Sequence, residues 1–141
     1  FSTITHWSVR CRYASGVEMT FGHGGDHTKF YGTEGWVSIR RGGLDAHPKS
    51  LLKSSIGPDE VHLVESLNHH GNFIEAIRTR AAPVSNIDDA VHSDLVSHVS
   101  DIAVRTRRKI TWDPVKEEIV GDAEASRMLV RAIREPWNFL T

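Results

Sequence analysis

The stretch "SNIDDAVHSDLVSHVSDIAVRTRRK" (residues 85–109) decides the fold, because helical periodicity is strongest there. Apolar side chains recur in it at steps of three or four residues, at Ile87, Val91, Leu95, Val99 and Ile102. This spacing places them on one face of an α-helix. Ser85 or Asn86 is suited to cap the first turn, and the basic residues of 105–109 favour the last turn. The segment therefore predicts a long amphipathic helix.

Upstream of this helix the period is two. In "THWSVRCRY" (residues 5–13), apolar residues alternate with polar ones at Trp7, Val9, Cys11 and Tyr13. Such alternation is typical of a strand with one packed face and one solvated face. The segments "VEMTFGHG" (17–24) and "WVSIRR" (36–41) also have strand character, and each follows a turn that contains glycine. These runs predict a meander of three antiparallel strands.

The other segments complete the expected architecture. Residues 42–60 have no sustained period, which predicts a short helix or a segment that wraps the sheet edge. A helix is expected to begin near Gly71 or Asn72 and to end before Pro83, and a closing helix is expected over residues 122–134. Strands followed by helices indicate an α+β fold, an open and mostly antiparallel sheet with helices packed on one face.

Length and composition limit the classes of function. A chain of 141 residues predicts a single domain, residues 1–141, with enough surface to bury a core. The formal net charge of −1 creates no long-range field that would recruit nucleic acid or an anionic membrane. No apolar run approaches the roughly 20 residues of a membrane span. The start at Phe1-Ser2-Thr3, without methionine or a signal segment, predicts a piece of a longer protein.

Candidate chemistry is concentrated in histidine-containing segments. "GHGGDH" (22–27) offers metal-ligand side chains, but its spacing matches no zinc signature, so a glycine-permitted loop is the preferred interpretation. His69-His70-Gly71-Asn72 stands at a helix start, where unpaired N–H groups attract polar ligand atoms. These residues either contact a ligand or only cap and pack the helix. The basic run over 105–109 either grips phosphate or complements the helix dipole, and the dipole is the preferred interpretation.

The later motifs resemble the C-terminal domain of the Gfo/Idh/MocA oxidoreductases. The family's F-x-x-A-I-R helix core matches residues 73–78, and it is followed by Pro83 and by Asp89-Ala90. One bacterial, sugar-related branch is similar in "HHGNFIEAIRTRAAPV" (69–84), "IAVRTRRKITWDP" (102–114) and "GDAEASRMLVRAIREPW" (121–137). The strand portion "GTEGWVSIRRG" (32–42) also fits, so the resemblance covers nearly all of the chain.

The resemblance implies a part of a two-domain enzyme. Family members carry an N-terminal Rossmann domain that binds NAD or NADP, and a C-terminal α+β domain that shapes the substrate side of the cleft and often forms oligomers through its sheet. Because the chain contains neither G-x-G-x-x-G nor Glu-Lys-Pro, we expect no Rossmann domain, catalytic residue, cofactor site or metal site in it. The residues expected to contact a sugar or a sugar-derived small molecule are His69, His70, Asn72 and His92.

The leading hypothesis is the substrate-binding and oligomerisation domain of an NAD(P)-dependent sugar oxidoreductase from a bacterium, inactive alone. A first alternative is a domain of an NAD-dependent glycosidase of the same family. A second is a non-catalytic module that forms homo-oligomers through its sheet, whose face with Arg10 and Arg12 would meet a symmetry mate. The expected compartment is the bacterial cytoplasm or periplasm, and the sequence does not separate the two.

Overall fold

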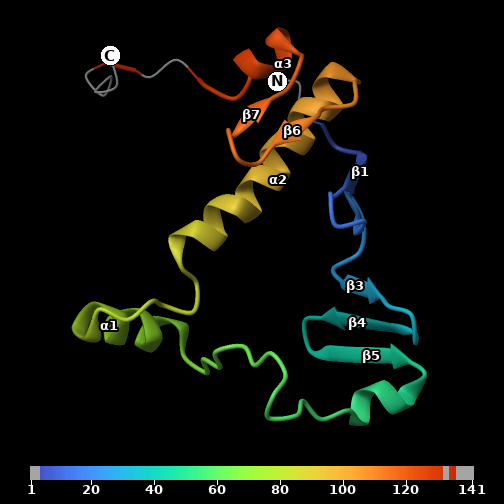
Figure 1. The fold of residues 1–141 in the computed structure, drawn as a ribbon, viewed down its shortest axis with the longest axis vertical. Coiled ribbons are helices and arrows are strands. Elements are labelled where there is room, and N and C mark those ends of the chain that lie inside the picture. Colours follow the sequence, from blue (N-terminus) through green and yellow to red (C-terminus); the bar gives the residue numbers. More distant parts are fainter. Residues whose placement is uncertain (1–3, 132–133, 136–141) are drawn as a thin grey trace. The chain divides into compact units, whose positions relative to one another are not determined.

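The computed structural model describes residues 4–131 and 134–135. Two compact units make up the chain, one formed by residues 1–23 with 85–141 and the other by residues 24–84. Each unit contains antiparallel strands and helix, so the fold is α+β, as the sequence predicts (Figure 1). The two units are described in turn.

The first unit begins with a hairpin. Strands β1 (Ser8–Arg12) and β2 (Glu18–Gly22) pair antiparallel, with Val9 opposite Phe21 and Cys11 opposite Met19. Residues of this face are half-buried and their neighbours are exposed, which confirms the predicted alternation. Gly16 closes the turn at φ 88°, a left-handed conformation that glycine adopts without steric cost.

Helix α2 (Ile87–Thr106) is the long helix that the sequence predicts. The side chain of Asn86 accepts a hydrogen bond from the N–H of Asp89 at 2.9 Å and so caps the first turn. Asp88 and Asp89 lie in the first turn and Arg105 in the last, as the helix dipole favours. The helix ends at Arg107, whose φ of 54° is left-handed, and it contacts β1.

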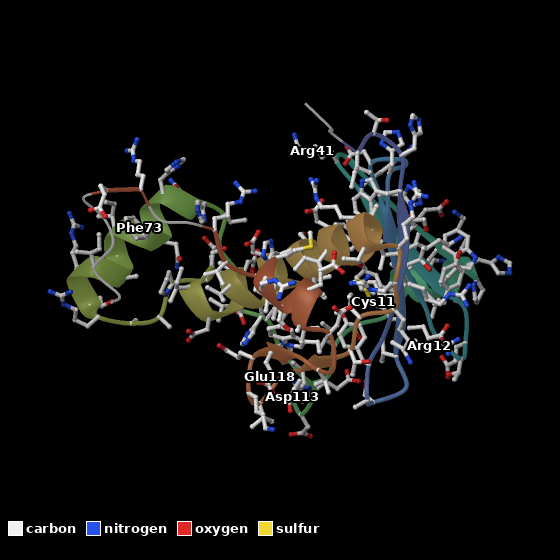
Figure 2. The ribbon with its side chains drawn as sticks, turned by 90° about the horizontal axis from the view of Figure 1, so that it is seen from above. Cys11, Arg12, Arg41, Phe73, Asp113 and Glu118 are labelled. Atoms are coloured by element: carbon white, nitrogen blue, oxygen red, sulfur yellow. The ribbon has the colours of Figure 1, made fainter. Side chains whose placement is uncertain are left out.

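The best-packed core of the described residues surrounds the C-terminal half of α2. Strands β6 (Trp112–Asp113) and β7 (Glu118–Ile119) and helix α3 (Ala123–Arg127) lie beside it (Figure 1), and Figure 2 shows Asp113 and Glu118 on the two short strands. The buried members of this core are Ile102, Ile119 and Ala125, at 1%, 5% and 0% exposure. Half-buried residues pack around them, namely Ile110, Trp112, Met128 and Leu129. Full burial of an Ile side chain contributes about 1.5–3 kcal/mol.

The closing helix is shorter than predicted. α3 ends at Arg127, and the next N–H groups, of Met128 and Leu129, donate to the carbonyls three residues back, at 2.9 and 3.2 Å. This tightening is common in a last helical turn. Val130 is 73% exposed, so no burial supports a further turn there. Residues 132–133 of the predicted helix lie outside the described residues.

The second unit contains a three-stranded antiparallel sheet in the order β3-β4-β5. Its strands are β3 (Thr28–Tyr31), β4 (Trp36–Arg40) and β5 (Gly43–His47), and the 3₁₀ helix η1 (Lys49–Lys53) follows. The predicted antiparallel pairing of β1 with β2 is confirmed, but the predicted meander of three strands is wrong, because β4 lies between two unpredicted strands in a separate sheet. Both missed strands are short and flanked by glycines, which weakens their pattern.

The two faces of the β3-β4-β5 sheet differ in chemistry. The register aligns one row of apolar side chains on a single face, hereafter the apolar sheet face: Phe30, Val37, Ile39, Leu44 and Ala46. Ala46 is buried, but Phe30, Ile39 and Leu44 are 60%, 49% and 59% exposed. On the opposite face, the Lys29 ammonium lies 3.7 Å from the centroid of the Trp36 ring. The described chain thus leaves the apolar sheet face largely open.

Candidate functional site

The candidate site predicted from sequence is built on the first turn of helix α1 (His69–Thr79). The side chain of Asn68 accepts from the N–H of Gly71 at 2.8 Å, and the N–H of Asn72 donates to the Asn68 carbonyl at 2.9 Å. Asn68 is therefore the cap, and the helix begins two residues before the predicted start at Gly71. A Cβ at position 71 would lie 3.2 Å from the Asn68 side chain, so glycine suits this close approach.

His69 and His70 occupy the first two helical positions. Both are exposed, and their rings form an edge-to-face pair with centroids 5.9 Å apart. The first N–H groups of a helix have no intrahelical partner, and the helix dipole makes this end partly positive. Because the side chain of Asn68 accepts only from the N–H of Gly71 and its carbonyl only from that of Asn72, the N–H groups of His69 and His70 remain for water or for a ligand. The turn can bind a hydroxyl or an anionic oxygen.

Asn72 has a structural contact of its own. Its side-chain oxygen accepts a hydrogen bond from the N–H of Val84 at 2.9 Å, so it binds the backbone of the segment that follows α1 and Pro83. This bond fixes the segment after α1 against the first turn of the helix. The side-chain oxygen of Asn72 therefore positions backbone, and only its amide NH₂ is left to meet a ligand.

His92 belongs to a different helix from this turn. It is exposed in the second turn of α2, which belongs to the first unit, whereas α1 belongs to the second unit. The structure thus brings His69, His70 and Asn72 together at one helix start, and it presents His92 on a different helix.

In the glycine-rich segment 22–27, Gly22 ends β2 and residues 23–27 form the loop that leads to β3. The N–H of His23 donates to the Trp7 carbonyl at 2.9 Å, and the His23 ring lies 4.9 Å from that of His6. Among residues 4–131 and 134–135, no group of three or more His, Cys, Asp or Glu side chains is placed to hold a metal ion. In the same part of the chain, no helix is long and apolar enough to cross a bilayer.

An arginine-lined groove in the first unit was not predicted from sequence. It lies between residues 4–10 and the last turn of α2, has a volume of about 910 Å³ and includes Arg10 and Arg107 in its lining. The basic run of α2 was visible in the sequence, but its approach to β1 depends on tertiary packing. No local signal could have joined the two segments.

Ion pairs organise the charges beside this groove. Arg108 donates to Asp122 at 3.0 and 3.2 Å and to Glu124 at 2.9 Å. These bonds, that to Glu124 first, raise the pKa of the Arg108 guanidinium. The pKa of Asp122 is lowered, mainly by the N–H of Ala125 and then by Arg108. Arg105 is likewise bound to Asp101 at 2.6 Å, which raises its pKa.

Comparison with known proteins identifies the class of domain. A family model described as the C-terminal alpha/beta domain of the oxidoreductase family, of the Gfo/Idh/MocA type, matches residues 4–139. The chain belongs to this family, and the match spans both units. Comparisons with curated proteins and with solved structures gave no match to this chain.

Proposed function

We propose that this chain forms the substrate side and the assembly surface of an NAD(P)-dependent sugar oxidoreductase and is inactive alone. The observation that carries the proposal is the family match over residues 4–139. In the proposal, NAD or NADP is bound by an N-terminal Rossmann domain, which is a separate partner of this domain. Hydride transfer is the chemistry that such a cofactor supplies.

The described residues do not fit a dinucleotide cradle. Such a cradle needs a glycine turn that leads from a strand into a helix, so that the helix N-terminus meets the pyrophosphate. The glycine-rich segment 22–25 leads instead from β2 towards β3. The proposal therefore assigns this chain to binding, orientation and assembly.

The start of α1 is the proposed point of contact with the sugar. A neutral imidazole has one donor and one acceptor nitrogen, so His69 and His70 can each serve a sugar hydroxyl in either sense. Both rings are exposed at an N-terminal turn whose first N–H groups are also donors. The amide NH₂ of Asn72 adds a further donor to this turn.

Steady-state kinetics of the full-length protein test this assignment. With NAD or NADP and a panel of free sugars and glycosides, we expect redox turnover, with KM for the sugar raised several-fold in His69→Ala/His70→Ala and kcat changed less. The matched control is His27→Ala, because His27 is an exposed histidine of the loop before β3. Absence of nicotinamide-dependent turnover would overturn the oxidoreductase proposal. Equal KM values in the double variant and the control would overturn only the assignment of the histidines.

Assembly is proposed to use the apolar sheet face. Exposed apolar side chains aligned across neighbouring strands are typical of a surface that another surface covers. Phe30, Ile39 and Leu44 form such a row, each about half exposed or more. This row also supports the second candidate function, a non-catalytic oligomerisation module.

Light scattering of the full-length protein tests the assembly surface. We expect an oligomer that Leu44→Lys dissociates, because a charge would be placed inside the interface. Ser38→Lys is the matched control, since Ser38 lies on the opposite face of the same sheet. A strictly monomeric wild type at high concentration would contradict sheet-mediated assembly. An oligomer without any redox turnover would favour the non-catalytic module.

A further inference from the structure

The groove of the first unit is lined by arginines from two separate elements. β1 contributes Arg10, and the end of α2 contributes Arg105, Arg107 and Arg108. No carboxylate is among the described lining residues. The volume of about 910 Å³ falls within the roughly 300–1,000 Å³ of small-molecule sites.

Two of these arginines are already neutralised. Arg105 is paired with Asp101, and Arg108 is paired with Asp122 and Glu124. By contrast, Arg10 and Arg107 form no ion pair with any carboxylate of residues 4–131 and 134–135. The unneutralised charge of the groove is therefore concentrated on these two guanidiniums.

Arg12, on the same strand as Arg10, does have an ion-pair partner. Arg12 is two residues along the same strand and on the same face as Arg10, and its cross-strand neighbour is Glu18, with which it forms an ion pair at 2.7 Å. The cross-strand neighbour of Arg10 is Thr20, which carries no charge. The hairpin thus satisfies one arginine and leaves the other facing the groove.

The dipole of α2 does not account for Arg10. A helix C-terminus carries about half a negative charge, and cations in its last turn complement it. That argument covers the arginines of 105–108, which belong to the helix end. Arg10 is an exposed residue of β1, so it does not belong to this set.

From these contacts we infer that the groove binds the phosphate group of a small phosphorylated molecule. Guanidinium groups present fixed pairs of N–H donors that match phosphate oxygens, which makes Arg10 and Arg107 the expected ligands of the phosphate. The rest of the lining includes Trp7, Val9, Ala103 and Val104, which offer apolar surface to the organic part of the molecule. This binding site does not depend on the sugar contacts proposed at α1.

Calorimetric titration of the full-length protein tests the site, with phenyl phosphate, inorganic phosphate and pyrophosphate as probes, none of which carries a sugar. We expect all three to bind, and phenyl phosphate to bind more tightly than inorganic phosphate because its ring can contact the apolar lining. Arg10→Gln/Arg107→Gln should weaken binding by about tenfold or more, since charge-assisted hydrogen bonds are lost. Raising the salt concentration should weaken binding further in the wild type than in this variant.

The matched control is Arg12→Gln, which removes an arginine of the same strand whose charge is already paired. Its affinity should stay within about twofold of the wild type, as expected for a satisfied ion pair. Thermal unfolding of each variant establishes that it is folded. Failure of all three probes to bind, equal loss in the control, or phenyl phosphate binding no more tightly than inorganic phosphate would overturn the inference.

Discussion

Helices α1 and α2 are similar in local chemistry and different in packing. Each is capped by an asparagine, Asn68 or Asn86, whose side chain accepts a backbone N–H, and each ends at an arginine in the left-handed conformation. Yet α2 buries Ser100 and Ile102, whereas α1 buries no residue. Capping and periodicity therefore form a helix in both units, but only the neighbours of a helix determine whether its apolar face is buried.

The same contrast holds between the apolar surfaces of the two units. Around α2, the chain returns through β6, β7 and α3 and closes a core on Ile102. In the second unit, Phe30 and Leu44 of the apolar sheet face and Phe73 of α1 (Figure 2) are each more than half exposed. Burying such an apolar surface against another protein surface would stabilise it. In the first unit, β6, β7 and α3 already bury Ile102 of α2.

The largest expected effect is that of Ile102→Ala. Ile102 is 1% exposed in the core beside α3, so its truncation removes buried surface and leaves a cavity. We expect the free energy of unfolding to fall by about 2–5 kcal/mol, measured by urea denaturation. Ile87→Ala, on the same helix but 72% exposed, is the control and should change it by no more than about 0.5 kcal/mol.

Ile77→Ala in α1 is the variant that can break the comparison. Ile77 is 49% exposed, so we expect its cost to be clearly smaller than that of Ile102→Ala. If both substitutions lower the free energy of unfolding of the full-length protein equally, the apolar face of α1 is as well covered there as that of α2. The difference in burial between the two helices would then exist only in this domain without the rest of the protein.

Local sequence signals predicted the helices better than the sheets. The cap and length of α2 follow from residues 85–109, because every determinant is within the helix itself. The Trp36 strand was predicted, but its partners were not, since β3 and β5 are recognisable chiefly by pairing with it. α3 was predicted too long because apolar residues continue past Arg127, but Met128 and Leu129 pack on the core from a tightened turn and Val130 is exposed.

The candidate sites also differ in how far local sequence predicts them. The start of α1 was predicted near Gly71 or Asn72, two or three residues after the observed start at His69, because the cap at Asn68 was not recognised. Whether these residues bind a sugar stays a prediction. The groove between Arg10 and Arg107 joins segments about a hundred residues apart in the chain, and no pattern in either segment indicates the other.

A smaller effect is expected from removing the helix caps. Asn86→Ala deletes the acceptor for the N–H of Asp89, which should lower the free energy of unfolding by about 1 kcal/mol. Asn68→Ala deletes the equivalent acceptor at α1, but that helix is not packed in the described structure. We therefore expect faster amide hydrogen exchange in α1 with little change in global unfolding. A global loss equal to that of Asn86→Ala would show that α1 unfolds together with the core.

The N–H of Ala125 and then Arg108 lower the pKa of Asp122, which should make the stability of the first unit depend on pH. The folded pKa of Asp122 lies below its ordinary value of 3.8, so its contribution is present above that pH and is lost as the pH falls through the folded value. Asp122→Asn keeps a side-chain acceptor for the N–H of Ala125 but removes the charge. We expect a slightly lower Tm for this variant at pH 7 and equal values at a pH below the folded pKa of Asp122. A difference that persists in acid would assign the effect to the cap alone.

The smallest effect is expected from Arg12→Gln, in the hairpin of the first unit. The Arg12–Glu18 pair measures 2.7 Å, but the two side chains are 70% and 52% exposed. Water and salt screen such a pair, so its loss should cost about 0.2–1 kcal/mol, measured by urea denaturation. Glu18→Gln should cost the same amount, and the double substitution should add little, because each single change already removes the interaction. A larger cost would mean that this face of β1 and β2 is covered in the full-length protein, and that the first unit, like the second, has a surface that its own chain does not cover.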